Sequence, residues 1–163
     1  RIYSQYVVLP NSLLHDALLD AAGRGVDVRI YTNSQKAGED LYWSTGYFIS
    51  LNYFARLVSA GVRVFLHPGV DDPKTRQPYL HAKQWIIDDQ LVMCGSFNLS
   101  MRSCFVESEN LVNIFDPSLA ASESARFDRL AATGVEVTSD FLREQYRNHR
   151  TTAEIARTFE LFF

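Results

Sequence analysis

The stretch LHAKQWIIDDQLVMCGSFN, residues Leu80–Asn98, combines an apolar hairpin pattern with polar side chains at both ends. His81 and Lys83 stand two residues apart beside the run QWII, and in a strand such residues point to the same side. Asp-Asp-Gln then marks a turn, and a second apolar run, LVMC, ends in Gly-Ser-Phe-Asn. The pattern predicts two neighbouring strands, His81–Ile87 and Leu91–Gly95, with polar groups gathered at one end.

The segments before this hairpin predict an α/β fold. IYSQYVVLP reads as one strand that Pro10 stops, and the helix after it has Asn11 or Ser12 as its cap. Two further strands, VDVRIYT and VRVFLH, each follow a helix and a glycine. This order is typical of stacked α/β units with parallel pairing. We therefore expect a mixed, mostly parallel β-sheet flanked by helices on both faces, an α/β/α sandwich.

The segments after the hairpin complete the domain. A strand over Asn110–Phe115 leads into a helix for which Asp116 or Ser118 is the cap. Residues 139–163 read as a C-terminal helical tail that ends in the apolar sequence FELFF. With 163 residues the chain has the length of one domain, residues 1–163. Because it begins almost directly on a strand, we expect it to be the second half of a longer protein.

Charge and cysteine content bear on the function classes. The chain has 16 Lys and Arg against 19 Asp and Glu, a net charge of −3, which disfavours a generic nucleic-acid binder. Cys94 and Cys104 lack metal-ligand spacing, and Cys94, within LVMC, is expected to be a small buried apolar residue. No apolar run is long enough to span a bilayer, and no signal peptide opens the chain.

An imidazole, an ammonium, a hydroxyl and a carboxamide can converge at one end of the hairpin. His81 and Lys83 come from the first strand, Ser96 and Asn98 follow the second, and Gly95 permits a close approach of backbone or ligand. This set suits a tetrahedral oxyanion, whose oxygens Lys83 and Asn98 bind while His81 attacks its centre. A metal site is disfavoured because the ammonium repels a cation. The structural alternative is a buried hairpin with a satisfied histidine.

The pattern HxKxxxxD at residues 81–88, followed by GSxN at residues 95–98, resembles the HKD motif of the phospholipase D superfamily. Downstream, GSFNLSMRSCFVESENLVNIFD is similar to that family's Gly-Ser-x-Asn-Leu, Arg-Ser and late acidic residue. Upstream, LLDAAGRGVDVRIYTNS and ARLVSAGVRVFLHPG are similar to the second half of bacterial cardiolipin synthases. The similarity covers most of the chain, from Tyr3 to about Leu130. It implies the phospholipase D-like fold for this domain.

The resemblance implies a role for each matching residue. His81 would be the nucleophile that forms a phosphohistidine intermediate, or the acid–base partner of such a histidine. Lys83 and Asn98 would hold the phosphoryl oxygens, and Ser96 would support the pocket by hydrogen bonding. Asp88 belongs to the catalytic motif, where its role is thought to be more structural than chemical.

An acidic residue further along completes the implied site. By spacing it falls on Glu109, which would accept a hydrogen bond from the other nitrogen of His81 and fix its tautomer. Glu107, two residues earlier, is a rival. Arg102 can add a cation near the mouth or close a surface salt bridge. The resemblance implies no cofactor and no metal.

The sequence departs from the family because it holds one HKD motif, whereas the family's active site uses two. One histidine attacks and the other protonates the leaving group. His15 and His149 are expected at the surface and His67 in a loop, and none of them has a lysine two residues on. Either two copies of the chain pair, or a missing N-terminal half supplies the partner motif. The abrupt start favours the missing half.

The resemblance favours a phospholipase D-type phosphodiesterase or phosphatidyltransferase of the cardiolipin synthase kind, with a phospholipid substrate. It implies a bacterial protein in the cytoplasm or peripheral to the inner membrane. One alternative is a metal-independent HKD nuclease acting as a homodimer, which the acidic balance disfavours. Another is a non-catalytic half-domain that supports a partner or a membrane assembly, with LYWSTGYF and FELFF as contact surfaces.

Overall fold

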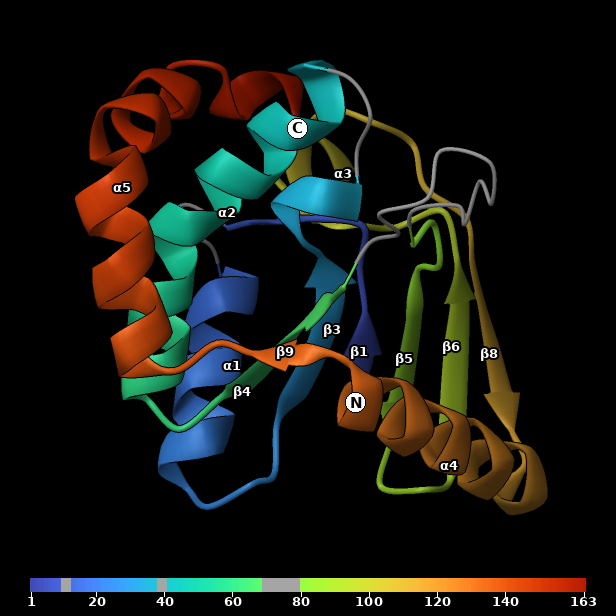
Figure 1. Ribbon diagram of the computed structural model, residues 1–163. Helices are drawn as coiled ribbons and strands as arrows, with labels where there is room; N and C mark the ends of the chain where they lie inside the picture. Colours follow the sequence, from blue (N-terminus) through green and yellow to red (C-terminus); the bar gives the residue numbers. More distant parts are fainter. Residues whose placement is uncertain (10–12, 38–40, 69–79) are drawn as a thin grey trace, which may run out of the picture.

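A seven-stranded mixed sheet runs through the molecule in the order β8-β6-β5-β1-β3-β4-β9 (Figure 1). This computed structural model describes residues 1–9, 13–37, 41–68 and 80–163. The strands of the sheet are β1 Ile2–Tyr3, β3 Arg29–Asn33, β4 Arg63–His67, β5 Gln84–Ile87, β6 Leu91–Gly95, β8 Leu111–Phe115 and β9 Val135–Glu136.

The sheet is mixed, as expected, but parallel pairing is confined to β1, β3 and β4. The other strands, β5, β6, β8 and β9, pair antiparallel to their neighbours. The parallel share is therefore smaller than the sequence analysis predicted. The reason is local for β5 and β6, because the short turn at Asp88–Gln90 that joins them permits antiparallel pairing only.

Helices cover both faces of the sheet, which confirms the expected sandwich (Figure 1). Alternate residues of the strands point to opposite faces. Ile30 and its neighbours in the sheet pack with α1 and α2, whereas Tyr31 packs against Phe127 of α4. The helices are α1 Leu13–Gly23, α2 Leu41–Ser59, α3 Met101–Phe105, α4 Pro117–Thr133 and α5 Ser139–Arg157, with short 3-10 turns η1 Gln35–Ala37 and η2 Glu160–Phe162.

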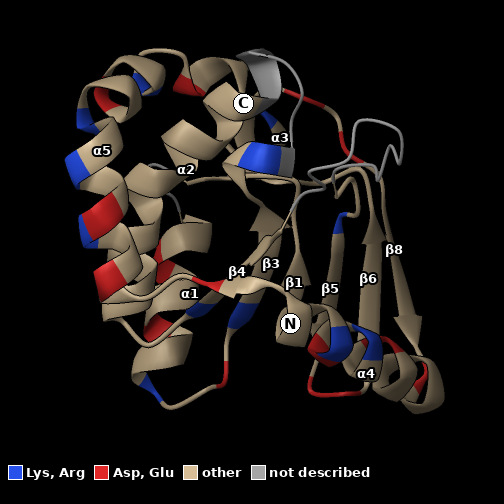
Figure 2. Cartoon of the chain, viewed as in Figure 1, with Lys and Arg blue, Asp and Glu red and all other residues tan. Residues whose placement is uncertain are grey.

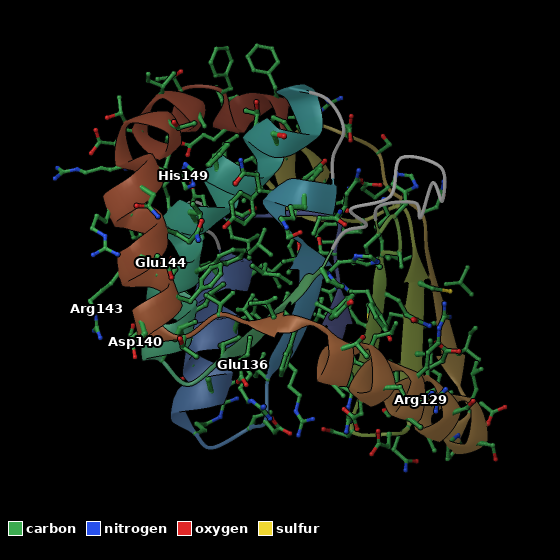
Figure 3. The ribbon with its side chains drawn as sticks, in the orientation of Figure 1. Arg129, Glu136, Asp140, Arg143, Glu144 and His149 are labelled. Carbon is green, nitrogen blue, oxygen red and sulfur yellow. The ribbon has the colours of Figure 1, made fainter. Side chains whose placement is uncertain are left out.

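Helix α5 packs along α2, so the C-terminal segment is part of the domain's core. Tyr146 donates from its hydroxyl to the carbonyl of Leu51, 2.7 Å away. Figure 3 shows Asp140 and Arg143 on the outer side of α5, away from α2. Helical geometry breaks at His149.

Two histidines expected at the surface lie elsewhere. His15 is buried under the N-terminal part of the fold, with 1% of its surface exposed. His149 is half-buried, and its ring lies 5.4 Å from the ring of Phe48. Both predictions were wrong because each histidine lies on the side of its helix that packs inward. Cys94, expected to be buried, is half-buried.

The expected N-terminal strand is divided into two. β1 belongs to the large sheet, and the chain then leaves it so that β2, Val7–Val8, pairs in parallel with β7, Leu99–Ser100. The division occurs at Ser4, whose hydroxyl donates to the carbonyl of Tyr6 at 2.7 Å and accepts from the amide of Leu99 at 2.9 Å. The hydroxyl thus ties the N-terminal link to the segment after β6.

Other predicted boundaries agree closely with the structure. β6 has the expected limits, and β8 begins one residue later than expected. The strand expected over His81–Ile87 begins at Gln84, so His81 and Lys83 precede it. Asp116 caps α4 by accepting from two backbone amides. The expected cap of α1, Asn11 or Ser12, lies outside the described residues. No helix in the described ranges is long and apolar enough to cross a membrane.

Gly95 is required by a close backbone approach at the end of β6. A Cβ atom there would fall on the carbonyl oxygen of Asn110 and lie 3.1 Å from the Cα of Leu111. We expect Gly95→Ala to lower the free energy of unfolding by ~1–3 kcal/mol, because rigid backbone must move. Urea denaturation measures this. Gly23→Ala is the matched control, since a Cβ at Gly23 meets nothing within 4 Å. Equal stability of the two variants would contradict the prediction.

Candidate active site

The two halves of the motif meet where β5 begins and β6 ends, at the upper end of the sheet in Figure 1. The amide of Gly95 donates to the carbonyl of Lys83 at 3.2 Å, which places the HxK segment against the GSxN segment. His81 is exposed and Lys83 is half-buried. The geometry therefore brings together the two segments that the sequence analysis joined by pattern alone.

The ammonium group of Lys83 is held by two hydrogen-bond acceptors. Its Nζ donates to the side-chain oxygen of Gln5 at 3.2 Å and to the carbonyl of His81 at 3.0 Å. Burial lowers the pKa of Lys83, and the carboxylate of Glu109 acts in the opposite direction. A half-buried cation with acceptors on one side is suited to hold an anion on its open side.

His81 stands two residues before Lys83, on backbone that Asn33 holds by hydrogen bonds. Desolvation of the ring, and then the Lys83 ammonium, lower the pKa of His81 below the 6.5 of an ordinary imidazole. Both effects favour the neutral imidazole, which is the form that a nucleophile requires. Asn33 at the end of β3 fixes the preceding residue, Leu80, accepting from its amide at 2.7 Å and donating to its carbonyl at 2.9 Å.

Ser96 and Glu109 form a second pair at the mouth of the site. The Ser96 hydroxyl donates to the carboxylate of Glu109 and accepts from the amide of Asn110 at 3.0 Å. The hydroxyl thus anchors the acidic residue next to Lys83, a supporting role like the one the resemblance implies. The expected hydrogen bond from His81 to Glu109 stays a prediction.

Asn98 is buried between the N-terminal link and α3. Its backbone amide donates to the hydroxyl of Ser103 at 3.1 Å, and its side-chain Nδ2 donates to the hydroxyl of Tyr6 at 3.4 Å. Its Oδ1 accepts from the amide of Gln5 at 3.4 Å. A carboxamide nitrogen has two hydrogens, so Asn98 keeps one for a ligand.

Gln5 joins these parts, and sequence reasoning missed it. Its side chain accepts from Lys83, its backbone amide donates to Asn98, and its carbonyl accepts from Nδ2 of Asn33 at 2.9 Å. Only 4% of its surface is exposed, and its Nε2 has no hydrogen-bond partner among the residues that the structure describes. The one sequence signal is a polar pair, Ser-Gln, that interrupts an apolar run.

The remaining candidates lie apart from this cluster. Asp88 lies in the turn at the opposite end of β5, with a positive φ of 53°. It therefore does not lie beside His81. Arg102 forms an ion pair with Glu107, which is the surface salt bridge expected as one role of Arg102. The ion pair engages the carboxylate that was the alternative to Glu109. His67, expected in a loop, ends β4, 6.0 Å from the ring of Tyr31.

Within residues 1–9, 13–37, 41–68 and 80–163, no group of three or more His, Cys, Asp or Glu side chains is placed to hold a metal ion. The cluster at the end of the hairpin instead contains the Lys83 ammonium, the His81 imidazole and the Asn98 carboxamide. Such a set fits a phosphoryl group, whose oxygens carry the negative charge and whose phosphorus accepts a nucleophile.

Comparison with known proteins assigns the family. The family described as cardiolipin synthase, PLD-like domain, matches residues 1–131, and the chain belongs to this family of phospholipase D-like domains. Cardiolipin synthase A of Yersinia pseudotuberculosis serotype O:3 is 29% identical over 150 residues. The match covers 92% of this chain and 28% of the relative, as it does for cardiolipin synthase A of Yersinia pestis. The chain thus spans little more than a quarter of these relatives.

Solved structures share the fold. Nuc from Salmonella typhimurium, a phospholipase D family member, has a TM-score of 0.64 and 26% identity. The match covers 85% of this chain and 81% of Nuc. Phosphatidylserine synthase of Haemophilus influenzae has a TM-score of 0.63 over 99% of this chain and 41% of its own, but at 14% identity this likeness shows the fold alone.

Gln5→Leu tests the contact between Gln5 and Lys83. The change removes an acceptor from a half-buried ammonium, and a hydrogen bond to a charged group contributes ~1.5–3 kcal/mol. We expect kcat/KM on a soluble phosphodiester to fall roughly ten- to hundredfold. The pKa of Lys83, followed by NMR of its side-chain carbon, should fall further because the charged form loses a partner. Gln90→Leu, at the far end of the hairpin, is the control, and equal behaviour of the two variants would contradict the prediction.

Proposed function

We propose that His81 attacks the phosphorus of a phospholipid phosphodiester, so that the domain takes part in hydrolysis or in transfer of the phosphatidyl group to an alcohol. The observation that carries the proposal is the geometry of the hairpin end, where the Lys83 ammonium donates to the His81 carbonyl and Gln5 contacts both Lys83 and the buried Asn98 carboxamide. Membership of the cardiolipin synthase PLD-like family supports phospholipid as the substrate class.

The reaction proceeds in two displacements. A ring nitrogen of His81 forms a bond to phosphorus, the bond to the leaving alkoxide breaks, and a second histidine gives the alkoxide its proton. The phosphohistidine is then attacked by water or by an alcohol, which returns a proton to the second histidine as the P–N bond breaks. Lys83 and Asn98 bind the phosphoryl oxygens in both steps, and Glu109 orients His81.

The second histidine comes from a second HKD half. The chain spans 28% of the cardiolipin synthase relatives, which leaves room in such proteins for another domain of this kind. We propose that this half is another segment of a longer protein, with the active site between the two. Contact with the membrane is then peripheral, because the substrate's phosphate lies at the membrane surface.

A homodimeric nuclease is the second candidate. Its support is Nuc, which this chain matches over 81% of Nuc's own length, so that a single domain of this size corresponds to nearly a whole protein. The charge balance opposes it, because a strand of nucleic acid needs a basic groove and the chain has a net charge of −3. Phosphatidylglycerol and plasmid DNA offered to the same sample separate the two functions.

His81→Asn tests the nucleophile. We expect kcat of the variant on phosphatidylglycerol to fall at least a thousandfold, because the variant lacks the imidazole nitrogen that forms the P–N bond. Quenching the wild type in alkaline detergent and mapping the phosphorylated peptide by mass spectrometry should find the adduct on His81. His67→Asn, outside the cluster, is the control. An adduct on another residue, or full activity of His81→Asn, would contradict the proposal.

Lys83→Gln tests the electrostatic coupling. The Lys83 ammonium disfavours the protonated imidazole, so its removal should raise the pKa of His81. The nucleophile works above its pKa, and the acidic limb of the kcat/KM profile should therefore move to higher pH in the variant. NMR titration of the His81 ring measures the same change without turnover. An unchanged or lowered pKa of His81 would show that the two groups do not interact.

A further inference from the structure

An apolar cavity of about 790 Å³ opens beside the site, between the start of α2, the second half of α5 and η2. Its volume is within the ~300–1,000 Å³ of small-molecule pockets. Among the described residues it is lined by Ser44, Thr45, Phe48, Thr152, Ile155, Ala156, Phe159, Phe162 and Phe163. The cavity joins the two stretches, LYWSTGYF and FELFF, that the sequence analysis named as candidate contact surfaces.

The described lining carries no charged side chain, and its rim is exposed and apolar. Phe159 and Phe162 are 48% and 61% exposed, and Leu161 between them is 63% exposed. Figure 2 shows the charged residues of α5 along the helix, while most of α2 is uncharged. Apolar surface of this kind in contact with water is unfavourable, and it marks a site for an apolar ligand or partner.

Two aromatic rings, those of Phe163 and Tyr6, lie between this cavity and Asn98 of the candidate active site. Phe163 lines the cavity, and its ring lies edge-on to the ring of Tyr6, with centroids 5.2 Å apart. The hydroxyl of Tyr6 accepts from Asn98. On the other side Arg102 of α3 donates to the carbonyl of Phe162 at 3.2 Å. In Figure 1, α3, the start of α2 and the C-terminus lie at the end of the molecule where β5 begins.

We infer that this cavity binds an acyl chain of the phospholipid whose phosphate lies at His81. The inference rests on the proposed function. Charge complementarity favours this occupant, because an amphiphile has an anionic phosphate and a neutral chain. The site offers the Lys83 ammonium at one end and an uncharged hollow beyond Tyr6 at the other. The ligand changes from a charged phosphate to an apolar chain, and the protein changes in the same order from the Lys83 ammonium to the uncharged cavity.

Binding of 11-dansylaminoundecanoic acid, a fluorescent fatty acid, tests the cavity without turnover. Ile155→Arg puts a charge into the lining, and Thr152→Trp fills the hollow; both positions are exposed, so the fold tolerates the changes. We expect saturable binding to the wild type and at least tenfold weaker binding to each variant. Val26→Arg, at a 48% exposed valine in the turn after α1, is the control and should bind as the wild type.

Equal binding of the probe to all four proteins, or no saturable binding, overturns the inference. Dimerisation in light scattering that Ile155→Arg abolishes also overturns it, because a second copy then occupies the cavity. Substrate length separates the inference from the function on which it rests. Ile155→Arg should raise KM tenfold for dioleoyl phosphatidylglycerol and leave KM for bis-p-nitrophenyl phosphate unchanged. Turnover of bis-p-nitrophenyl phosphate but not of dioleoyl phosphatidylglycerol by the wild type contradicts phospholipid as the substrate class, whereas turnover of dioleoyl phosphatidylglycerol with an unchanged KM in Ile155→Arg contradicts the acyl-chain site.

Discussion

Three residues between β1 and β2, Ser4–Tyr6, hold the parts of the site together. Ser4 binds the segment after β6, Gln5 binds Lys83, and Tyr6 binds Asn98. Hydrogen bonds of buried groups are costly to leave unmade, so this link helps to fix the relative positions of the HxK and GSxN segments. The geometry of the candidate site therefore depends on the point where the first strand leaves the sheet.

The electrostatics of the site follow from this arrangement. Lys83 is half-buried. Desolvation lowers the pKa of its ammonium group, and the carboxylate of Glu109 acts to raise it. The same ammonium acts against protonation of His81. Phosphoryl transfer needs a cation to neutralise the oxygens and an imidazole to supply the electron pair, and the lowered pKa of His81 favours the imidazole form that has this pair.

Much of the fold and most of the site could be predicted from the sequence, because they depend on local pattern. Alternating apolar residues and a turn defined the β5–β6 hairpin, and spacing along it put His81, Lys83, Ser96 and Asn98 at one end. The division of the first strand could not be predicted, since Ser4 and Gln5 are compatible with strand periodicity and differ only in contacts with distant residues. Gln5 became visible only when the structure placed Lys83 and Asn98 on either side of it.

His15 was predictable in principle. It stands three residues before Leu18, and such residues share a helix face, so the apolar stripe of α1 includes the histidine. The expectation of a surface position gave too much weight to residue type. Asp88 illustrates the opposite case, because the sequence pattern already puts it in the turn after the first strand of the hairpin, and the structure confirms this place.

The most direct test of the account is a crystal structure of the chain with orthovanadate, a mimic of the phosphoryl transition state. The account predicts one vanadate at the start of β5, with vanadium within bonding distance of a His81 ring nitrogen and its oxygens contacting Lys83 Nζ and Asn98 Nδ2. Vanadate bound away from His81, or bound there without contact to Lys83, would contradict the proposal that these residues form one phosphoryl-transfer site.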